Sequence, residues 1–256
     1  MNAYDKVMAA RDSKRLTAVD YINKMFGSSF IEMHGDRRFG DDKAIVGGLA
    51  MLYDQPITVI GIEKGRNTKE RMNRNFGSAN PEGYRKALRL MKQAEKFHRP
   101  VFCLVDTSGA YPGIGAEERG QGLAIAENLM EMMTLKTPVL SIIIGEGGSG
   151  GALALAVADE VWMLEDSIYS VISPEGCASI LWKDSSKAPE ASNCLKLTSH
   201  DLFDLGVIER IIREPVDSDD RKMFEGLKML VARTFEKNMA VDTDKIIDTR
   251  YARFRK

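Results

Sequence analysis

Two stretches of the chain repeat the same order of features, and this repeat constrains the fold more than any other part of the sequence. Residues 99–110 read RPVFCLVDTSGA, and residues 137–148 read TPVLSIIIGEGG. Each has a proline, an almost continuous apolar run, and then a turn that contains glycine and leads towards a helical pattern. Almost continuous apolar runs are typical of parallel strands that helices cover on both faces. The repeat therefore predicts an α/β fold with right-handed crossover connections.

The segments around the repeat predict further elements of the same fold. Residues 44–52 and 57–63 are apolar runs on either side of a short turn, which predicts a hairpin. A helix is predicted from near Pro81, because proline is favoured in the first turn of a helix. Two more strands are predicted within residues 160–176, and a last helix over residues 220–239.

The ends of the chain suggest a simple domain division. We expect a helical arm over residues 1–40, in which Thr17 and Asp20 form a capping box, and one domain with a C-terminal helix over residues 41–256. Thr198 and Asp201 form a second capping box, and Gly206 stands where that helix would end. The first forty residues are expected either to pack on the chain's own core or to contact a partner subunit.

Composition excludes several classes of protein. The 256 residues carry a net charge of −1, so a general attraction to nucleic acid or to an anionic membrane is not expected. Cys103, Cys177 and Cys194 show no CxxC spacing, which argues against a disulfide framework and a zinc site. With no signal-peptide pattern and no apolar run long enough to span a membrane, we expect a cytoplasmic protein.

The glycine-rich stretch GEGGSGGALALAVADE, residues 145–160, has three chemical interpretations. A phosphate-binding P-loop is excluded, because Gly151 stands where the motif needs lysine. Gly145, Gly147 and Gly150 fit a dinucleotide-binding GxGxxG pattern, with Glu165 about twenty residues further on, but this match alone is weak.

The third interpretation is an oxyanion hole, in which backbone N–H groups bind an oxygen that gains negative charge. Turns that end neighbouring parallel strands would direct their amides into one crevice. The candidates are Gly150 and Gly151 in the second turn and Gly109 and Ala110 in the first. The structural alternative is that the glycines only permit close packing of helix on strand.

Several longer motifs resemble the alpha subunit of bacterial acetyl-CoA carboxylase carboxyltransferase. The resemblance covers about Gly35 to Pro215 and rests on ANPEGYRKALRL, DTSGAYPGIGAEERG, AEERGQGLAIAENL, IGEGGSGGALALAVAD and YSVISPEGCASILW, and on DDKAIVGG and KGRNTKERMNRNFG. It implies the crotonase/ClpP-like spiral of repeated ββα units, which agrees with the repeat.

The resemblance also implies a reaction and partners. In this family the carboxyl group of carboxybiotin, which arrives on a carrier protein, is moved to acetyl-CoA and gives malonyl-CoA for fatty acid synthesis. A separate biotin carboxylase uses ATP. The alpha subunit is expected to hold the biotin oxygen through Gly150 and Gly151, with Gly109 and Ala110 as further candidates. A beta subunit, in an assembly of two alpha and two beta chains, would hold the enolate, so this chain alone should be inactive.

Other functions remain open at this stage. A stand-alone crotonase-type CoA hydratase or isomerase would need an acid and a base, for which Glu117, Glu118 and Glu146 are the candidates. A subunit that only supports assembly is another possibility. Ser108 and Ser149 lie in the turns, but none of His34, His98 and His200 is placed by local sequence to activate them, so a serine hydrolase is not expected.

A basic loop precedes the helix at Pro81. The family match favours a contact between this loop and the phosphates of CoA or the carrier protein, and the alternative is an ordinary solvated loop. Its candidate residues are Lys64, Arg66, Lys69, Arg71 and Arg74.

Overall fold

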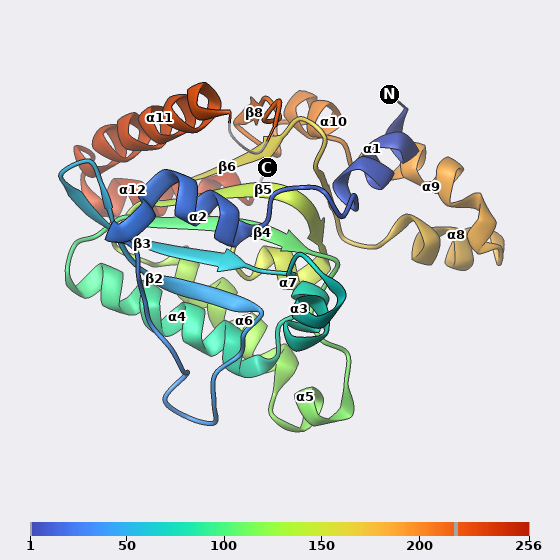
Figure 1. Ribbon diagram of the computed structural model, residues 1–256, viewed down its shortest axis with the longest axis horizontal. Coiled ribbons are helices and arrows are strands. Elements are labelled where there is room, and N and C mark those ends of the chain that lie inside the picture. Colours follow the sequence, from blue (N-terminus) through green and yellow to red (C-terminus); the bar gives the residue numbers. More distant parts are fainter. Residues whose placement is uncertain (1, 218–219, 256) are drawn as a thin grey trace.

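The computed structural model describes residues 2–217 and 220–255, which form one mixed eight-stranded sheet with helices on both faces (Figure 1). The strands are β1 Ile31–Glu32, β2 Ile45–Leu52, β3 Gln55–Ile62, β4 Val101–Thr107, β5 Val139–Gly148, β6 Glu160–Leu164, β7 Ile168–Ser170 and β8 Arg210–Ile212. Their order is β1-β2-β3-β4-β5-β6-β8. The first three pair antiparallel, and β3, β4, β5, β6 and β8 run parallel. The predicted hairpin is therefore confirmed.

The repeated unit forms the centre of this sheet. β4 and β5 pair in parallel from Val101 opposite Val139 onwards. β5 is long enough to pair with β6 through its first half and with β7 through its last residues, Glu146 to Gly148. The predicted α/β fold with buried parallel strands is confirmed, and both repeats end at the same edge of the sheet.

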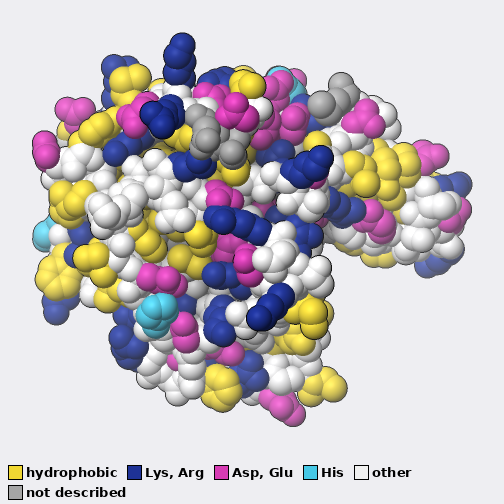
Figure 2. All heavy atoms as spheres, viewed as in Figure 1, with side chains coloured by type: hydrophobic (Ala, Val, Ile, Leu, Met, Phe, Trp, Pro, Cys, Tyr) yellow, Lys and Arg dark blue, Asp and Glu magenta, His cyan; other side chains and the backbone are white. Residues whose placement is uncertain are grey.

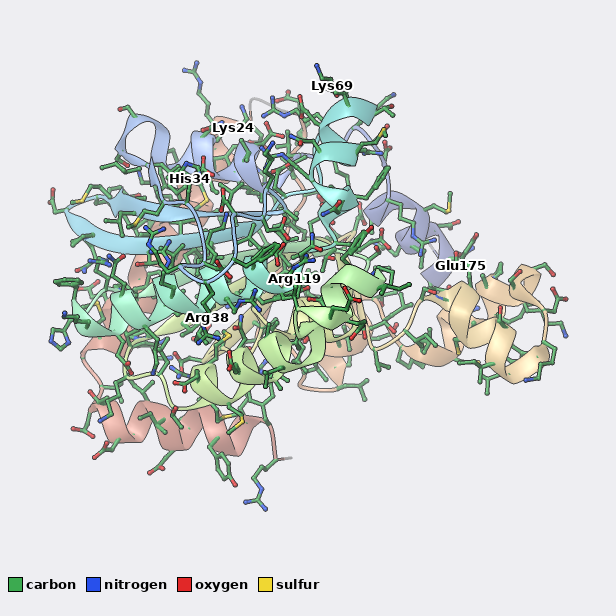
Figure 3. All side chains as sticks on the ribbon, turned by 90° about the horizontal axis from the view of Figure 1, so that it is seen from below. Lys24, His34, Arg38, Lys69, Arg119 and Glu175 are labelled. Atoms are coloured by element: carbon green, nitrogen blue, oxygen red, sulfur yellow. The ribbon has the colours of Figure 1, made fainter. Side chains whose placement is uncertain are left out.

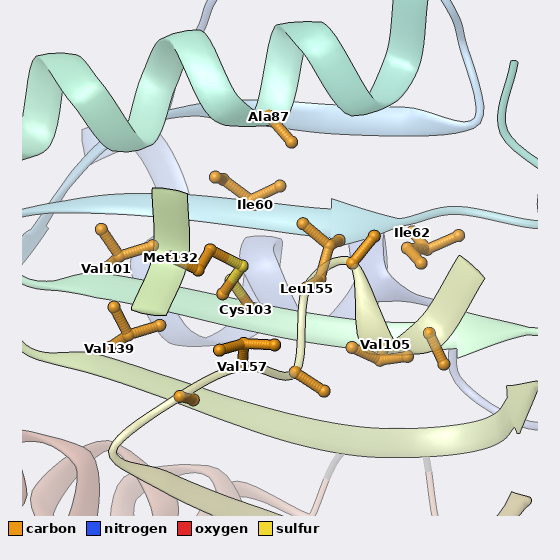
Figure 4. Close-up of a cluster of buried hydrophobic side chains, with 14 of the residues drawn as sticks. Ile60, Ile62, Ala87, Val101, Cys103, Val105, Met132, Val139, Leu155 and Val157 are labelled. Atoms are coloured by element: carbon orange, nitrogen blue, oxygen red, sulfur yellow. The ribbon is translucent and has the colours of Figure 1, made fainter. Parts of the chain in front are cut away.

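Helices cover the two faces of the sheet with separate apolar cores. One face packs against α4 Pro81–Lys96, α6 Gln121–Met133 and α7 Ser149–Leu153, and Figure 4 shows this core around Cys103 and Met132. The other face packs against α2 Ala18–Phe26 and α11 Arg221–Met239. Residues of β4 alternate between the cores, with Cys103 facing one and Phe102 facing the other. This alternation is what a doubly covered strand requires.

The N-terminal residues pack on the body of the molecule. α2 begins at the predicted capping box of Thr17 and Asp20, and Tyr21, Ile22 and Met25 of this helix are buried on the sheet. α1 Ala3–Ala10 lies against α9 Ala188–Leu195. The domain boundary at residue 40 stays a prediction.

α8 Pro174–Trp182 and α9 project from the body together with α1, and hydrophobic side chains are visible on this projecting part (Figures 1 and 2). Ile180 and Leu181 of α8 are 63% and 61% exposed. Exposed apolar residues that gather on one part of a surface are typical of a protein–protein contact.

The remaining helices are α3 Thr68–Asn73, α5 Ile114–Glu118, α10 Ser199–Asp204 and α12 Thr243–Arg253. α10 begins after Thr198, whose hydroxyl accepts a hydrogen bond from the Asp201 N–H and donates one to the Asp201 carboxylate. The predicted N-cap is therefore present, but the bond from the Thr198 N–H to the Asp201 carboxylate that completes a capping box is not formed. α12 was not predicted from the sequence. It is anchored by Arg250, which is fully buried and donates to the carbonyl oxygens of Met132, Leu135 and Thr137.

No helix in the described ranges has the length and apolar character needed to cross a membrane.

Candidate functional site

The turns after β4 and β5 meet at the edge of the sheet. The β-carbon of any other residue at Gly151 would lie 2.7 Å from the Ala110 nitrogen and 2.9 Å from the Gly109 carbonyl carbon. A β-carbon at Gly148 would overlap the Ser108 carbonyl group. Glycine is therefore required where one turn lies directly against the other. The structure brings together all four predicted residues, Gly109, Ala110, Gly150 and Gly151.

The first turn is closed by its own side chain. The Thr107 hydroxyl accepts a hydrogen bond of 3.0 Å from the Gly109 N–H and donates one of 2.9 Å to the Gly109 carbonyl. Gly109 has a φ of 150°, a conformation that favours glycine. Because the Gly109 N–H already has an acceptor, Ala110 is the better placed donor of the first pair.

Among the described residues, no side chain closes the second turn in the way that Thr107 closes the first. Ser149 begins α7 with a φ of 51°, and no side chain among the described residues caps this helix. Gly150 and Gly151 follow, and the first N–H groups of a helix have no carbonyl one turn back within it. Gly150 is half-buried and Gly151 is buried.

A buried carboxylate lies beneath both turns. Asp106 Oδ1 accepts hydrogen bonds from Lys64 Nζ at 2.8 Å and from the Glu146 N–H at 2.9 Å. The Asp106 side chain is only 2% exposed, and a β-carbon at Gly145 would overlap it. Lys64, predicted as a substrate contact, therefore holds the loop after β3 against the second turn.

The other predicted basic residues lie around α3. Arg66 pairs with Asp20, Arg71 donates to the Gly65 carbonyl at 3.2 Å, and Arg74 donates to the Lys43 carbonyl at 2.6 Å. Lys69 points away from the body (Figure 3). The arginines thus shape the loop, and a contact with substrate stays a prediction.

The three candidate acid–base residues lie in different surroundings. The Glu146 carboxylate accepts a hydrogen bond of 3.0 Å from Arg11, which also pairs with Glu175 at 2.7 Å where α1 meets α8 (Figure 3). This hydrogen bond lowers the pKa of Glu175 more than burial raises it, and the two carboxylates raise the pKa of Arg11. Glu117 and Glu118 are exposed on α5.

No metal site or serine triad is found in the part of the chain that the structure describes. There, no three His, Cys, Asp or Glu residues are grouped so as to hold a metal ion. His34 contacts Asp41 and His200 lies near Glu165, and neither is hydrogen-bonded to Ser108 or Ser149.

An apolar pocket of about 380 Å³, which the sequence did not reveal, adjoins the second turn. Its lining residues come from five separate parts of the chain: Ser149, Gly150, Leu153, Tyr169, Ser170, Val171, Leu202, Val207 and Phe254. Because these residues are far apart in the sequence, no local motif could have predicted them together.

The whole chain, residues 1–256, matches the family described as acetyl co-enzyme A carboxylase carboxyltransferase-like. It is 60% identical to the acetyl-coenzyme A carboxylase carboxyl transferase subunit alpha of Ruminiclostridium cellulolyticum, with all of this chain and 98% of that protein covered. The protein of the same name from Clostridium perfringens is 59% identical, covering 99% of this chain and 94% of its own length. This chain belongs to the acetyl-CoA carboxylase carboxyltransferase family. The family predicted from the motifs is confirmed, and with it the prediction of a carboxyltransferase subunit.

Solved structures of low sequence identity share the fold. A Pseudomonas malonate decarboxylase heterotetramer in complex with coenzyme A has a chain with a TM-score of 0.71 at 14% identity, covering 92% of both chains. Transcarboxylase 12S gives a TM-score of 0.69 at 20% identity, covering 86% of this chain and 43% of the other. The predicted fold class is thereby confirmed.

Proposed function

We propose that this chain is the alpha half of an enzyme that transfers the carboxyl group of carboxybiotin to acetyl-CoA, which gives malonyl-CoA for fatty acid synthesis. Carboxybiotin arrives on a biotin carboxyl carrier protein, after a separate biotin carboxylase has formed it with ATP. A beta subunit completes the active site, in an assembly of two alpha and two beta chains in the cytoplasm.

The contact between Gly151 and the turn at Gly109 and Ala110 carries this proposal, together with the family. It places backbone N–H groups of two strands at one edge of the sheet. In the proposed role, the Gly150, Gly151 and Ala110 amides donate to the biotin ureido oxygen, which gains charge as the carboxyl group leaves. One preorganised donor of this kind lowers the barrier by about 3 kcal/mol.

The same geometry argues for a second subunit. Among the described residues, the carboxylates next to the two turns are already paired, Glu146 with Arg11 and Asp106 with Lys64, so the turns offer donors but no free base. A partner that contributes the other half of the site would also cover apolar residues such as Val171 and Ile180.

A stand-alone hydratase or isomerase fits the structure less well. Its acid and base would work in a cleft from which water is excluded. Glu117 and Glu118 are instead exposed, and Glu146 is held by an arginine.

The test is co-purification with the beta subunit from the same genome, followed by the reverse reaction of malonyl-CoA with biocytin. We expect acetyl-CoA from the complex and none from either chain alone. Turnover of malonyl-CoA or of an enoyl-CoA by the isolated chain would refute the proposal.

A further inference from the structure

The strand that carries the second turn loses its regular pairing just before that turn. β5 pairs with β6 up to Ile143 and with β7 only from Glu146 onwards. On its other side, the register with β4 shifts between Ile143 and Gly147. Among the described residues, Ile144 and Gly145 therefore have no register partner in either neighbouring strand. The backbone that leads to the proposed amide donors must be held here by other groups.

Arg15, in the segment between α1 and α2, binds this unpaired part of β5. Its Nη2 and Nε atoms donate to the Ile144 carbonyl oxygen at 2.8 and 3.3 Å. Asp106 holds the same stretch two residues later, since its carboxylate accepts from the Glu146 N–H at 2.9 Å. The Arg15 side chain is only 11% exposed, so water competes little for the hydrogen bonds to Ile144.

Glu214 fixes the orientation of Arg15. Its carboxylate accepts hydrogen bonds from Arg15 Nη2 at 2.8 and 3.1 Å, and from the Asp166 N–H at 2.9 Å. Glu214 follows β8 and Asp166 follows β6. One guanidinium group therefore connects the carboxyl ends of β5, β6 and β8, which are neighbours in the sheet. A planar guanidinium suits this position, because its donors have fixed directions.

The N-terminal segment does not depend on Arg15 for its attachment to the body. α2 buries its apolar face on the sheet, and Lys6 of α1 forms an ion pair with Asp166. These contacts place the segment without Arg15. What Arg15 adds is a bond to the carbonyl of Ile144, six positions before Gly150.

We propose that Arg15 is a positioning residue for carboxyl transfer. It fixes the Ile144 carbonyl and so holds the end of β5 where Gly151 lies against the first turn. The inference rests on the proposed function, which gives the Gly150 and Gly151 amides a reacting oxygen to bind. Amides stabilise a developing charge only while they are held in alignment, so loss of the Arg15 contact should slow the reaction even in a folded complex.

A cavity of about 330 Å³ beside Arg15 makes a direct test possible. Its lining comes from α1, α2 and the segment between them, from β5, and from the residues that follow β6 and β8. Arg15, Ile144 and Glu214 are among the lining residues. Truncation of Arg15 would enlarge this cavity at the place of the guanidinium group. Free guanidinium has the same planar set of donors and is small enough to occupy that place.

The experiment compares Arg15→Ala with the wild-type chain in the complex with the beta subunit, by the reverse reaction of malonyl-CoA with biocytin. We expect kcat to fall by about thirtyfold, which is less than the loss of a whole amide donor would cause. Millimolar guanidinium chloride should raise the rate of the variant by about tenfold and reach saturation, because it restores the planar donors. Ammonium chloride at the same concentration should not, and the wild-type complex should gain nothing from guanidinium.

Titration calorimetry separates this role from a loss of folding. Partial unfolding would lower the number of binding sites for biocytin and for coenzyme A alike. A positioning role keeps both numbers at their wild-type values and weakens only biocytin binding, by about fivefold. Lys6→Met is the matched control, because it removes an ion pair of the same segment and leaves the bond between Arg15 and Ile144 intact. Its kcat should equal that of the wild type.

The outcomes distinguish the two levels of inference. If the wild-type complex does not transfer the carboxyl group, the proposed function fails and this inference fails with it. In an active complex, a wild-type kcat of Arg15→Ala overturns only the role of Arg15. A slow variant that guanidinium does not repair, a loss of activity in proportion to lost binding sites, or an equal loss in Lys6→Met would also overturn it, since Arg15 would then support the fold alone.

Discussion

The turns that end β4 and β5 begin from similar sequences, yet different interactions hold them. Thr107 closes the first turn by bonding both the N–H and the carbonyl of Gly109. The second turn is fixed by groups from elsewhere, because Asp106 accepts from the Glu146 N–H and Arg11 binds the Glu146 carboxylate.

The two glycine turns therefore have different roles, one in packing and the other in leaving backbone amides open. The first turn is stable by itself and offers a rigid surface on which Gly151 packs. The second is left open at its amides, as a donor site must be, and relies on contacts from outside. Changes in the second turn should therefore affect activity most, and changes in the first should affect stability.

Gly151→Ala should have the largest effect. The added carbon would lie 2.7 Å from the Ala110 nitrogen, so one turn must move and the amides lose their alignment. We expect carboxyl transfer by the complex to fall by about a hundredfold or more. Gly150→Ala is the matched control, because its nearest neighbour, Ile125, would be at an ordinary 3.6 Å. Equal activity of the two variants would mean that the turns do not act together.

Gly109→Ala should follow in size but act on stability. There is open space for the side chain, yet the φ of 150° suits glycine alone, so the strain should cost about 1–3 kcal/mol. Urea unfolding of the isolated chain measures this loss. An unchanged unfolding free energy would show that the first turn relaxes to a different conformation without cost.

Thr107→Val should cost about 1 kcal/mol, because it removes the hydroxyl that satisfies the Gly109 N–H. Thr107→Ser keeps the hydroxyl and serves as the control in the same unfolding experiment. If the serine variant loses as much stability as the valine variant, the methyl group of Thr107 and not its hydroxyl supports the turn.

Arg11→Gln should have the smallest effect, and one that depends on pH. Because the Arg11 hydrogen bond lowers the pKa of Glu175, the pair stabilises the chain above the unfolded pKa of about 4.3. The stabilisation is lost as pH falls through the lowered folded pKa. The difference from wild type should be about 1 kcal/mol or less at pH 7 and shrink below about pH 4, as measured by unfolding across pH. A constant difference would assign the effect to packing.

Sequence patterns predicted those parts of the fold that depend on neighbouring residues. The hairpin, the two buried strands and the capping box at Thr17 follow from local apolar runs and helix-start signals, and all are present, while Thr198 forms only the N-cap of the second predicted box. β8 could not be predicted because three residues at a sheet edge are too short to show a period, and α12 could not because one of its two buried residues, Ile246 and Arg250, is charged.

The candidate site was predictable only in part, for a similar reason. Glycines after two parallel strands indicated where amides would gather, since parallel strands end at one edge of a sheet. Contacts such as Lys64 with Asp106 and Arg11 with Glu146 join residues 42 and 135 positions apart. No local pattern marks these pairs, so the sequence alone does not show that Lys64 is paired with Asp106.

The buried pair of Lys64 and Asp106 also limits how this chain can diverge by single substitutions. Loss of either partner leaves an uncompensated charge beneath both turns, which costs about 3–5 kcal/mol, while neutral replacement of both is often tolerated. A double variant with two neutral residues can be stable, but each single variant on the way to it is unstable. We therefore expect the two residues to be kept together or replaced together. In a library of single substitutions, every change at either position would be destabilising.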